Sequence, residues 1–199
     1  INDKTVIEHI IDKFTFYGAK NFFITVNYKS RILKSFFHEL QPNYQVKFLD
    51  ETIPLGTVGG LRVYKRKFKE PFFVTNCDII VDIDYVDFYD FHKKNKNDLT
   101  LVASARNFEI PYGICELDAK GKLSKINEKP TQNFLANTGL YILNPKVLKL
   151  VPKNKFYHMT QLIHEAKKSG MNVGIYPIDD KKWVDVGQWS EYRKNIKKI

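Results

Sequence analysis

Residues 72–80 read Phe-Phe-Val-Thr-Asn-Cys-Asp-Ile-Ile, an apolar run introduced by Pro71 and ending on the acid Asp78. Such a run predicts a buried β-strand that stops at a carboxylate. In open α/β sheets, ligands bind at the carboxyl ends of strands, so Asp78 is placed to hold a metal-bound phosphate. An Asp at a strand end also caps turns, and this stretch alone leaves both interpretations open.

Helical and strand patterns alternate on either side of this stretch. The first half predicts helices over residues 6–17, 29–40 and 84–94, and strands over 21–26, 46–49 and 72–75. Residues 5–8, Thr-Val-Ile-Glu, form a capping box that opens the first helix. The second half predicts strands over 99–105, 114–117, 123–127, 138–143 and 173–176, a hairpin turn at 118–122, and helices over 145–150, 159–169 and 188–198. This order predicts one α/β domain over residues 1–199, with a Rossmann-like, doubly wound mixed sheet flanked by helices.

Composition narrows the class of protein. The chain has 199 residues, of which 43% are hydrophobic and 14% aromatic, as expected for a globular domain. No stretch approaches the roughly 20 apolar residues that span a bilayer, and no signal peptide opens the chain. The two cysteines, Cys77 and Cys115, have no metal-ligand spacing and are expected as reduced thiols. We therefore expect a cytoplasmic protein without a membrane partner.

The net charge of +10 does not by itself indicate nucleic-acid binding. The lysines are scattered over polar faces and turns and do not form one stripe with interleaved aromatic residues. We therefore expect no nucleic-acid partner, and only weak, salt-sensitive association with DNA or RNA.

A glycine-bearing loop precedes a predicted helix from about Thr57 to Arg66. Residues 54–60 read Pro-Leu-Gly-Thr-Val-Gly-Gly, and glycines let the backbone approach a flat ligand closely. Backbone amides at a helix start can bind a base edge or a phosphate. A tight turn with no ligand is the equal alternative.

Three motifs in the second half offer polar groups at strand ends. In Glu128-Lys129-Pro130, the proline is expected to hold Lys129 in an extended conformation that suits a phosphate, with Glu128 binding sugar hydroxyls. The alternative is an ordinary surface ion pair. Tyr112-Gly113 and Asn137-Thr138-Gly139 are each consistent with a sugar contact or with a strand-entry turn.

A second buried acid, Asp185, follows a short apolar run in Trp-Val-Asp-Val-Gly at 183–187. It could cap the terminal helix, or it could share one Mg²⁺ with Asp78, since Mg²⁺ prefers oxygen ligands and substrate phosphates. Asp82 and Asp84 form a rival metal pair, although Asp84 is favoured as the start of a helix.

The ordered set of these motifs resembles the sugar-1-phosphate nucleotidyltransferase family over nearly the whole chain. The Leu-Gly-Thr-x-Gly form of the loop is most similar to guanylyltransferases acting on mannose-, glucosamine- or heptose-1-phosphate, especially those fused to a pair of CBS domains. The resemblance implies a GT-A-like architecture and transfer of a nucleotidyl group, preferably GMP from GTP, to a sugar 1-phosphate. Neither the CBS pair nor the family's first strand and Gly-rich phosphate loop is in these 199 residues.

The resemblance also implies roles for particular residues. The candidate catalytic residues are Asp78, Lys129 and Asp185, with the two acids as Mg²⁺ ligands. The candidate nucleotide-binding residues are Leu55, Gly56, Thr57, Gly59 and Gly60. The candidate sugar-phosphate-binding residues are Tyr112, Gly113, Glu128, Lys129, Asn137 and Thr138. The substrates would be a nucleoside triphosphate and a sugar 1-phosphate, and a homo-oligomer is a further expectation.

Two other functions remain open from sequence. A glycosyltransferase with a similar sheet would hold its metal through Asp82 and Asp84. A non-catalytic module that binds a nucleotide-sugar is the third alternative. Replacing Asp82 while sparing Asp78 separates the first from the nucleotidyltransferase.

Overall fold

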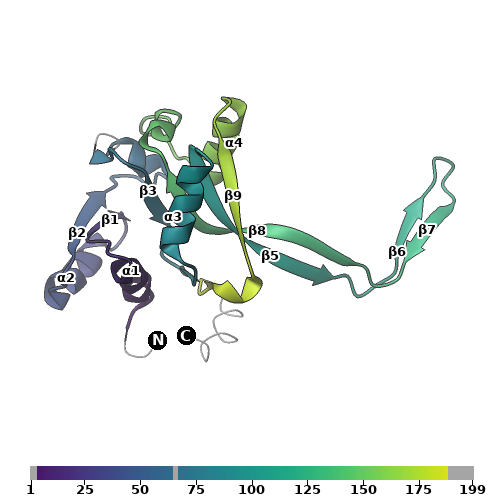
Figure 1. The fold of residues 1–199 in the computed structure, drawn as a ribbon, viewed down its shortest axis with the longest axis horizontal. Helices are drawn as coiled ribbons and strands as arrows, with labels where there is room; N and C mark the ends of the chain where they lie inside the picture. The colour runs from purple at the N-terminus through teal and green to yellow at the C-terminus, as the bar shows by residue number, and fades with distance from the viewer. Residues whose placement is uncertain (1–3, 65–66, 188–199) are drawn as a thin grey trace.

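The computed structural model describes residues 4–64 and 67–187, and a four-stranded mixed sheet forms its centre (Figure 1). The strand order is β3-β8-β5-β9, with bounds Phe72–Thr75, Thr131–Leu143, Leu99–Glu109 and Val173–Ile178. β8 runs antiparallel to both β3 and β5, whereas β5 and β9 are parallel. The expected mixed α/β fold with a central sheet flanked by helices is confirmed.

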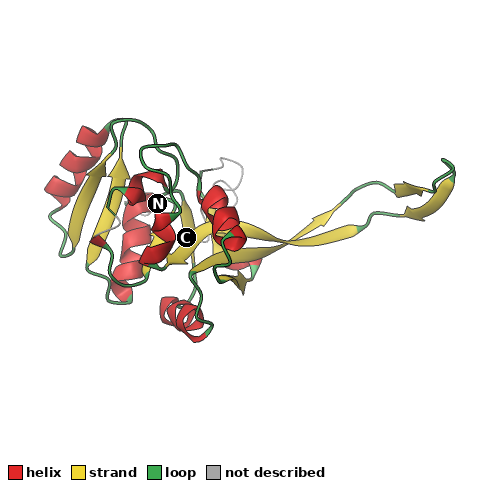
Figure 2. Ribbon diagram, turned by 90° about the horizontal axis from the view of Figure 1, so that it is seen from above, coloured by secondary structure: helices red, strands yellow, loops and turns green. Residues whose placement is uncertain are grey.

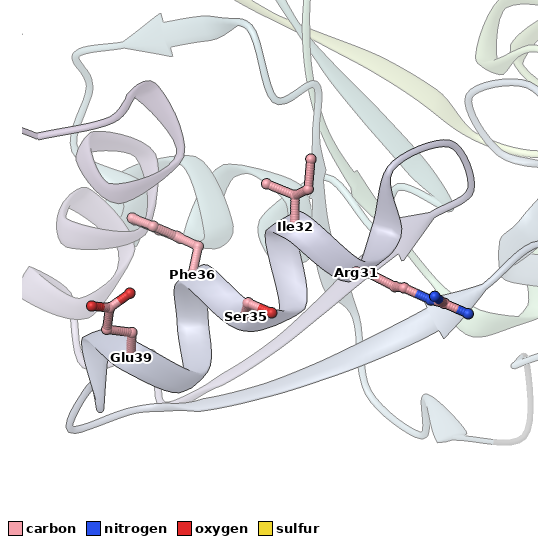
Figure 3. Close-up of a pocket in the computed structure, with 5 residues that line it drawn as sticks. All are labelled: Arg31, Ile32, Ser35, Phe36 and Glu39. Atoms are coloured by element: carbon pink, nitrogen blue, oxygen red, sulfur yellow. The ribbon is translucent and has the colours of Figure 1, made fainter.

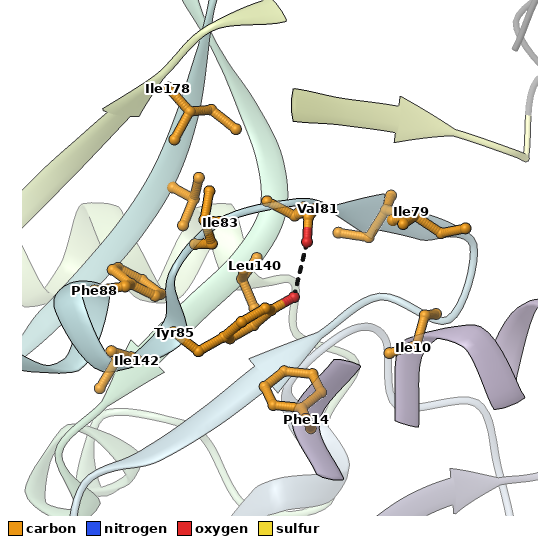
Figure 4. Close-up of a cluster of buried hydrophobic side chains, with 12 residues drawn as sticks. Ile10, Phe14, Ile79, Val81, Ile83, Tyr85, Phe88, Leu140, Ile142 and Ile178 are labelled. Carbon is orange, nitrogen blue, oxygen red and sulfur yellow. Dashed lines mark hydrogen bonds between the residues drawn. The ribbon is translucent and has the colours of Figure 1, made fainter. Parts of the chain in front are cut away.

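Alternation along the central strands sends side chains to two cores. Leu140 and Ile142 of β8 join one buried cluster, and their neighbours Tyr141 and Leu143 join the other. The first cluster packs against α1 (Val6–Phe16), β4 (Ile79–Val81) and α3 (Tyr85–Lys94), as Figure 4 shows. The second packs against the loop before residue 60 and α4 (Met159–Lys168). Side-chain alternation thus dictates a sheet covered on both faces.

The N-terminal part contains a smaller sheet of two parallel strands. β1 (Asn21–Val26) and β2 (Gln45–Asp50) pair in parallel and are connected through α2 (Ser30–Leu40). The capping box expected at α1 is present, because the Glu8 carboxylate accepts from the Thr5 N–H at 2.7 Å. Within the described part, these strands form their own two-stranded sheet.

A long arm leaves the core (Figures 1 and 2). It comprises the outer halves of β5 and β8, followed by a hairpin of β6 (Ile114–Leu117) and β7 (Leu123–Asn127). We call residues 105–135 the arm. Its side chains are largely exposed, including apolar ones such as Phe108, Leu117 and Leu123. The hairpin turn expected at 118–122 is present: the Asp118 N–H donates to the Lys122 carbonyl oxygen, and the Lys122 N–H donates to the Asp118 carboxylate, each at 2.9 Å.

Several expected boundaries were wrong. The helix predicted from Thr57 to Arg66 is a short 3₁₀ turn, η1 (Gly59–Arg62), and residues 145–150 also form a 3₁₀ helix, η3 (Pro145–Lys149). Two adjacent glycines weaken an α-helix, and η1 is shaped by packing rather than by helical propensity. β5 runs four residues further than expected and β8 begins at Thr131, so Asn137-Thr138-Gly139 lies inside a strand rather than at its entry.

The C-terminal part of the described chain contains η4 (Asp180–Lys182) and β10 (Trp183–Asp185). β10 pairs antiparallel with β4. The terminal helix predicted over residues 188–198 lies outside the described residues. Among the described helices, none is both long and apolar enough to cross a membrane.

Candidate active site

Asp78 and Asp185 meet because of the pairing between β4 and β10. Asp78 lies directly before β4, and Asp185 pairs with Ile79 in the antiparallel register. The Val186 N–H also donates to the Asp78 carbonyl oxygen at 2.9 Å. Residues that are far apart in sequence are therefore fixed side by side by backbone hydrogen bonds. We call Asp78 and Asp185 the acid pair.

The two carboxylates approach one point beside Gly187. A Cβ atom added at Gly187 would lie 2.8 Å from Asp78 Oδ2 and 3.2 Å from Asp185 Oδ1. The Gly187 N–H donates to Asp185 Oδ1 at 3.0 Å and fixes its orientation. Any side chain at position 187 would enter the space between the acids. Gly187 was not among the predicted site residues, although the Asp-x-Gly spacing carried the signal.

The acid pair has the chemistry that Mg²⁺ requires. Both were expected to be buried, but Asp78 is exposed and Asp185 is half-buried, because the strands end at an open edge of the core. The described residues contain no group of three or more His, Cys, Asp or Glu side chains suited to a metal. Two carboxylates at an open edge fit an ion whose remaining ligands are water and substrate phosphates.

The carboxylates of the rival metal pair, Asp82 and Asp84, each interact with other groups of the protein. Asp82 forms an ion pair with Lys13 of α1 at 2.6 Å. Asp84 is the N-cap of α3, accepting from the Val86 and Asp87 N–H groups, so its expected role as a helix start is confirmed. An arrangement in which these two acids share a metal would have to give up both interactions.

Asn137 and Thr138 line β8 close to the acid pair. The Asn76 N–H, two residues before Asp78, donates to the Gly139 carbonyl oxygen at 3.0 Å. Thr138 is buried and donates its hydroxyl to the Val102 carbonyl oxygen at 2.9 Å, which is a structural bond. Asn137 is exposed, and its amide donates to the Tyr141 hydroxyl at 2.8 Å. Asn137 is therefore the more accessible of the two to a ligand.

The glycine-bearing loop is shaped by its contact with residues 155–159. The Val58 N–H donates to the Tyr157 carbonyl, and the Tyr157 N–H donates to the Leu55 carbonyl. Gly56 has φ +77°, and a Cβ atom there would lie 2.7 Å from the Tyr157 oxygen. Gly56 is thus required by a close backbone approach as well as by its left-handed conformation. Leu55, Val58, Gly59 and Gly60 are buried, whereas Thr57 is exposed.

Two side chains hold this loop in place. The Thr57 hydroxyl accepts from the Met159 N–H at 2.8 Å, so it caps α4 rather than a helix of its own. The Glu51 carboxylate accepts from the Leu55 N–H at 3.1 Å and lies against Gly60. Glu51 was not predicted as a site residue, because the sequence around an acid that follows a strand does not show which loop its carboxylate will contact.

The other predicted sugar-site residues lie in the middle of the arm, where the β5–β8 ladder ends and the hairpin of β6 and β7 begins. Tyr112 is 73% exposed. A Cβ atom at Gly113 would lie 2.9 Å from Glu128 Oε2, so these motifs do meet. The expectation of an extended Lys129 was wrong, because its φ is +44°, in the left-handed region. The turn that joins β7 to β8 overrides the usual preference of a residue before proline.

The arm separates these residues from the acid pair. Between the pairs Ala103–Asn137 and Glu109–Thr131, every residue of β5 has a partner on β8. At about 3.3 Å per residue, this ladder is about 20 Å long. The structure therefore gathers the acid pair and Asn137 on the core, whereas Tyr112, Gly113 and Glu128 lie about 20 Å away, where the ladder ends and the hairpin of β6 and β7 begins.

Cys77 adjoins the acid pair but is not an activated nucleophile. Partial burial and the neighbouring Asp78 charge raise the pKa of the Cys77 thiol, so it stays protonated at neutral pH. Both cysteines are free thiols, as expected. His92 is buried on α3 and bonds to the Thr100 hydroxyl, and burial lowers the pKa of its imidazole.

A shallow hollow lies on α2, away from these residues (Figure 3). Its lining side chains come from one helix face, and none was predicted as a site residue. They are Arg31, Ile32, Ser35, Phe36 and Glu39.

A central mixed sheet with helices on its faces, and two acids brought together by the neighbouring pair β4 and β10, define an α/β protein with a polar site at strand ends. The model of the nucleotidyl transferase family matches residues 1–199, and the chain belongs to that family. This confirms the family resemblance of the sequence motifs.

Relatives and solved structures agree with this assignment. The chain is 31% identical to a mannose-1-phosphate guanyltransferase of Yarrowia lipolytica, covering 96% of this chain and 54% of the relative. For the corresponding Candida albicans enzyme, the identity is 30% with the same coverage. The chain thus spans about half the length of the curated relatives it matches.

The fold is also found in HddC from Yersinia pseudotuberculosis. The TM-score is 0.71 at 23% identity, covering 95% of this chain and 83% of HddC. A structure of HddC complexed with GMP-PN gives a TM-score of 0.71 at 21% identity, covering 97% and 84%. At these identities the likeness concerns the fold.

Proposed function

We propose that this protein transfers GMP from GTP to a sugar 1-phosphate, giving a GDP-sugar and pyrophosphate. Mannose 1-phosphate is the first candidate acceptor, because relatives named for this activity cover nearly the whole chain. The observation that carries the proposal is the acid pair, two carboxylates directed at one point in a nucleotidyl transferase fold.

The reaction needs positioning and charge neutralisation. A phosphate oxygen of the sugar 1-phosphate attacks the α-phosphorus of GTP, a new P–O bond forms, and the bond to the β-phosphate breaks to release pyrophosphate. Asp78 and Asp185 would hold Mg²⁺, which when bound neutralises phosphate charge. Asn137, on the core beside the acid pair, would contact the sugar 1-phosphate there, whereas Tyr112, Glu128 and Lys129 lie about 20 Å along the ladder and are not placed to reach the same phosphate. Gly56 and Thr57 would contact the base from the loop.

The preference for guanine rests on hydrogen bonding. Guanine offers N1–H and 2-amino donors beside an O6 acceptor, and a close backbone loop can satisfy both kinds of group. Each unpaired group on the wrong base would cost roughly 1–3 kcal/mol. We expect GTP to be preferred over dTTP, UTP, CTP and ATP.

The test is pyrophosphate release by the full-length protein with Mg²⁺, mannose 1-phosphate and each nucleotide in turn. Turnover with GTP at least tenfold above the other nucleotides is the expected result. Comparable turnover with UTP or dTTP would contradict the guanine assignment. Binding of GDP-mannose without turnover of any nucleotide would favour the non-catalytic module instead.

The remaining expectations belong to this proposal. We place the reaction in the cytoplasm, supported by the two free thiols. A homo-oligomer and a CBS-domain pair in the full-length protein stay predictions, and size measurement of the full-length protein tests the first. The absence of a nucleic-acid partner is tested by DNA binding at physiological salt, where we expect only weak association.

A further inference from the structure

Arg106 stands where the arm leaves the core. β5 is buried up to Ser104 and exposed beyond it, and Arg106 is half-buried at this boundary. Its guanidinium carbon lies 4.7 Å from the centre of the Trp183 ring. At this distance, a cation over an indole face is held by a cation–π interaction. The side chain is thus fixed by an aromatic platform rather than by an acid.

Trp183 belongs to the strand that presents Asp185. The two residues are separated by one position on β10, so their side chains lie on the same face of the strand, about 7 Å apart along it. The register of β10 with β4 places Trp183 opposite Val81 and Asp185 opposite Ile79, next to Asp78. Arg106 is therefore a positive charge held against the strand that carries Asp185.

Arg106 has unused hydrogen-bonding capacity. The ion pairs found in the described part of the chain involve Lys4, Lys13, Lys34 and Lys146, and none involves Arg106. A guanidinium has five N–H donors in a planar fork that matches a phosphate in two-point contact. Stacking on Trp183 restricts the side chain before any ligand arrives, which reduces the entropy lost on binding.

We propose that Arg106 binds the phosphate group of the sugar 1-phosphate. This inference rests on the proposed function and adds a cation that the sequence motifs did not indicate. Lys129, the cation that the motifs do indicate, lies beyond the outer end of the β5–β8 ladder, whereas Arg106 lies nearer the core, against the strand that carries Asp185 and on the strand that leads to Tyr112. The acceptor phosphate is favoured over the triphosphate of GTP because of this position between the acids and the sugar-site residues of the arm.

The test compares Arg106→Gln and Arg106→Lys with the wild-type full-length protein. With saturating GTP and Mg²⁺, Arg106→Gln should raise the KM for mannose 1-phosphate about 10- to 100-fold, as expected for losing a charge-assisted contact. Arg106→Lys should recover part of this loss, because it keeps the charge but not the fork. The KM for GTP should change less than threefold. Arg31→Gln, an exposed arginine on α2, is the matched control and should change neither KM.

Calorimetric binding of mannose 1-phosphate separates this inference from the proposed function. Wild-type binding that Arg106→Gln weakens at least tenfold, with an unchanged thermal midpoint, supports the role of Arg106 even if no nucleotide turns over. Equal binding by wild type and Arg106→Gln overturns it, as does a rise confined to the KM for GTP. If Arg106→Gln fails to fold, the same comparison with Arg106→Lys decides, and unchanged sugar-phosphate binding by that variant overturns the inference.

Discussion

The inner and outer halves of β5 and β8 pair along the same two strands, with one register shift between Leu101 and Ala103, but have opposite surroundings. In the inner half, Leu99 and Leu140 are fully buried, one in each of the two core clusters. In the outer half, Phe108 and Phe134 are more than half exposed. The core is stabilised mainly by burial of side chains, whereas the arm is held mainly by backbone pairing. Most of the buried area thus lies in the inner half of these strands, and the predicted sugar contacts Tyr112, Gly113 and Glu128 lie beyond the outer half.

The largest effect should come from matched leucines in the two regions. Leu140 is 0% exposed in the core and Leu117 is 71% exposed in the hairpin of the arm. Leu140→Ala should lower the free energy of unfolding by about 3–5 kcal/mol, because it removes buried methyl groups and leaves a cavity. Leu117→Ala should change it by no more than about 0.5 kcal/mol. Urea denaturation followed by circular dichroism measures the free energy of unfolding of both variants. Equal losses of stability would contradict the account, because they would mean that Leu117 is buried in a packing contact.

A smaller contrast is expected between two glycines that share a left-handed backbone. Gly56 has φ +77° and Gly121, in the hairpin of the arm, has φ +76°. Alanine at either position meets the same backbone strain, about 1–2 kcal/mol. Only Gly56→Ala also brings a Cβ atom to 2.7 Å from the Tyr157 oxygen, whereas the corresponding site at Gly121 is open.

Gly121→Ala should therefore cost about 1–2 kcal/mol in the same denaturation experiment, from backbone strain alone, and Gly56→Ala about 2–5 kcal/mol, because the close contact adds about 1–3 kcal/mol to the same strain. Indistinguishable midpoints for the two variants would mean that the contact between the loop and Tyr157 does not constrain the folded state.

Local sequence signals predicted the elements that rest on local contacts. The Thr5–Glu8 capping box and the Asp84 N-cap involve groups within three residues of each other, and both were predicted correctly. The strands of the inner core were also predicted, because alternating or continuous apolar runs record their burial.

Features that depend on distant partners were not predictable. Residues 106–109 and 131–135 form strands through pairing with each other, without a buried face that would mark them in the sequence. Thr57 caps a helix that begins at Met159, and Glu51 supports a loop that folds back over it. The stacking of Arg106 on Trp183 likewise joins residues that no sequence motif connects.

The part of the candidate site that lies at strand ends was predictable from the sequence. Asp78 and Asp185 were selected because each ends a short apolar run, and the structure brings their carboxylates to one point. Their exposure was not foreseen, since an apolar run does not show that its last residue lies at an open edge. The distance between the acid pair and the predicted sugar-site residues Tyr112 and Glu128 depends on the length of the β5–β8 ladder, which the sequence did not reveal.

Metal-dependent turnover in acid-pair variants tests the central claim most directly. Pyrophosphate release from GTP and mannose 1-phosphate would be measured for Asp78→Asn, Asp185→Asn and the control Asp82→Asn as the Mg²⁺ concentration is varied. Asp82 carries a similar exposed carboxylate but is paired with Lys13. The account predicts at least a 100-fold loss of turnover, with a raised Mg²⁺ requirement, for Asp78→Asn and Asp185→Asn, and near wild-type behaviour for Asp82→Asn. Full activity in Asp78→Asn, or loss in Asp82→Asn alone, would contradict it.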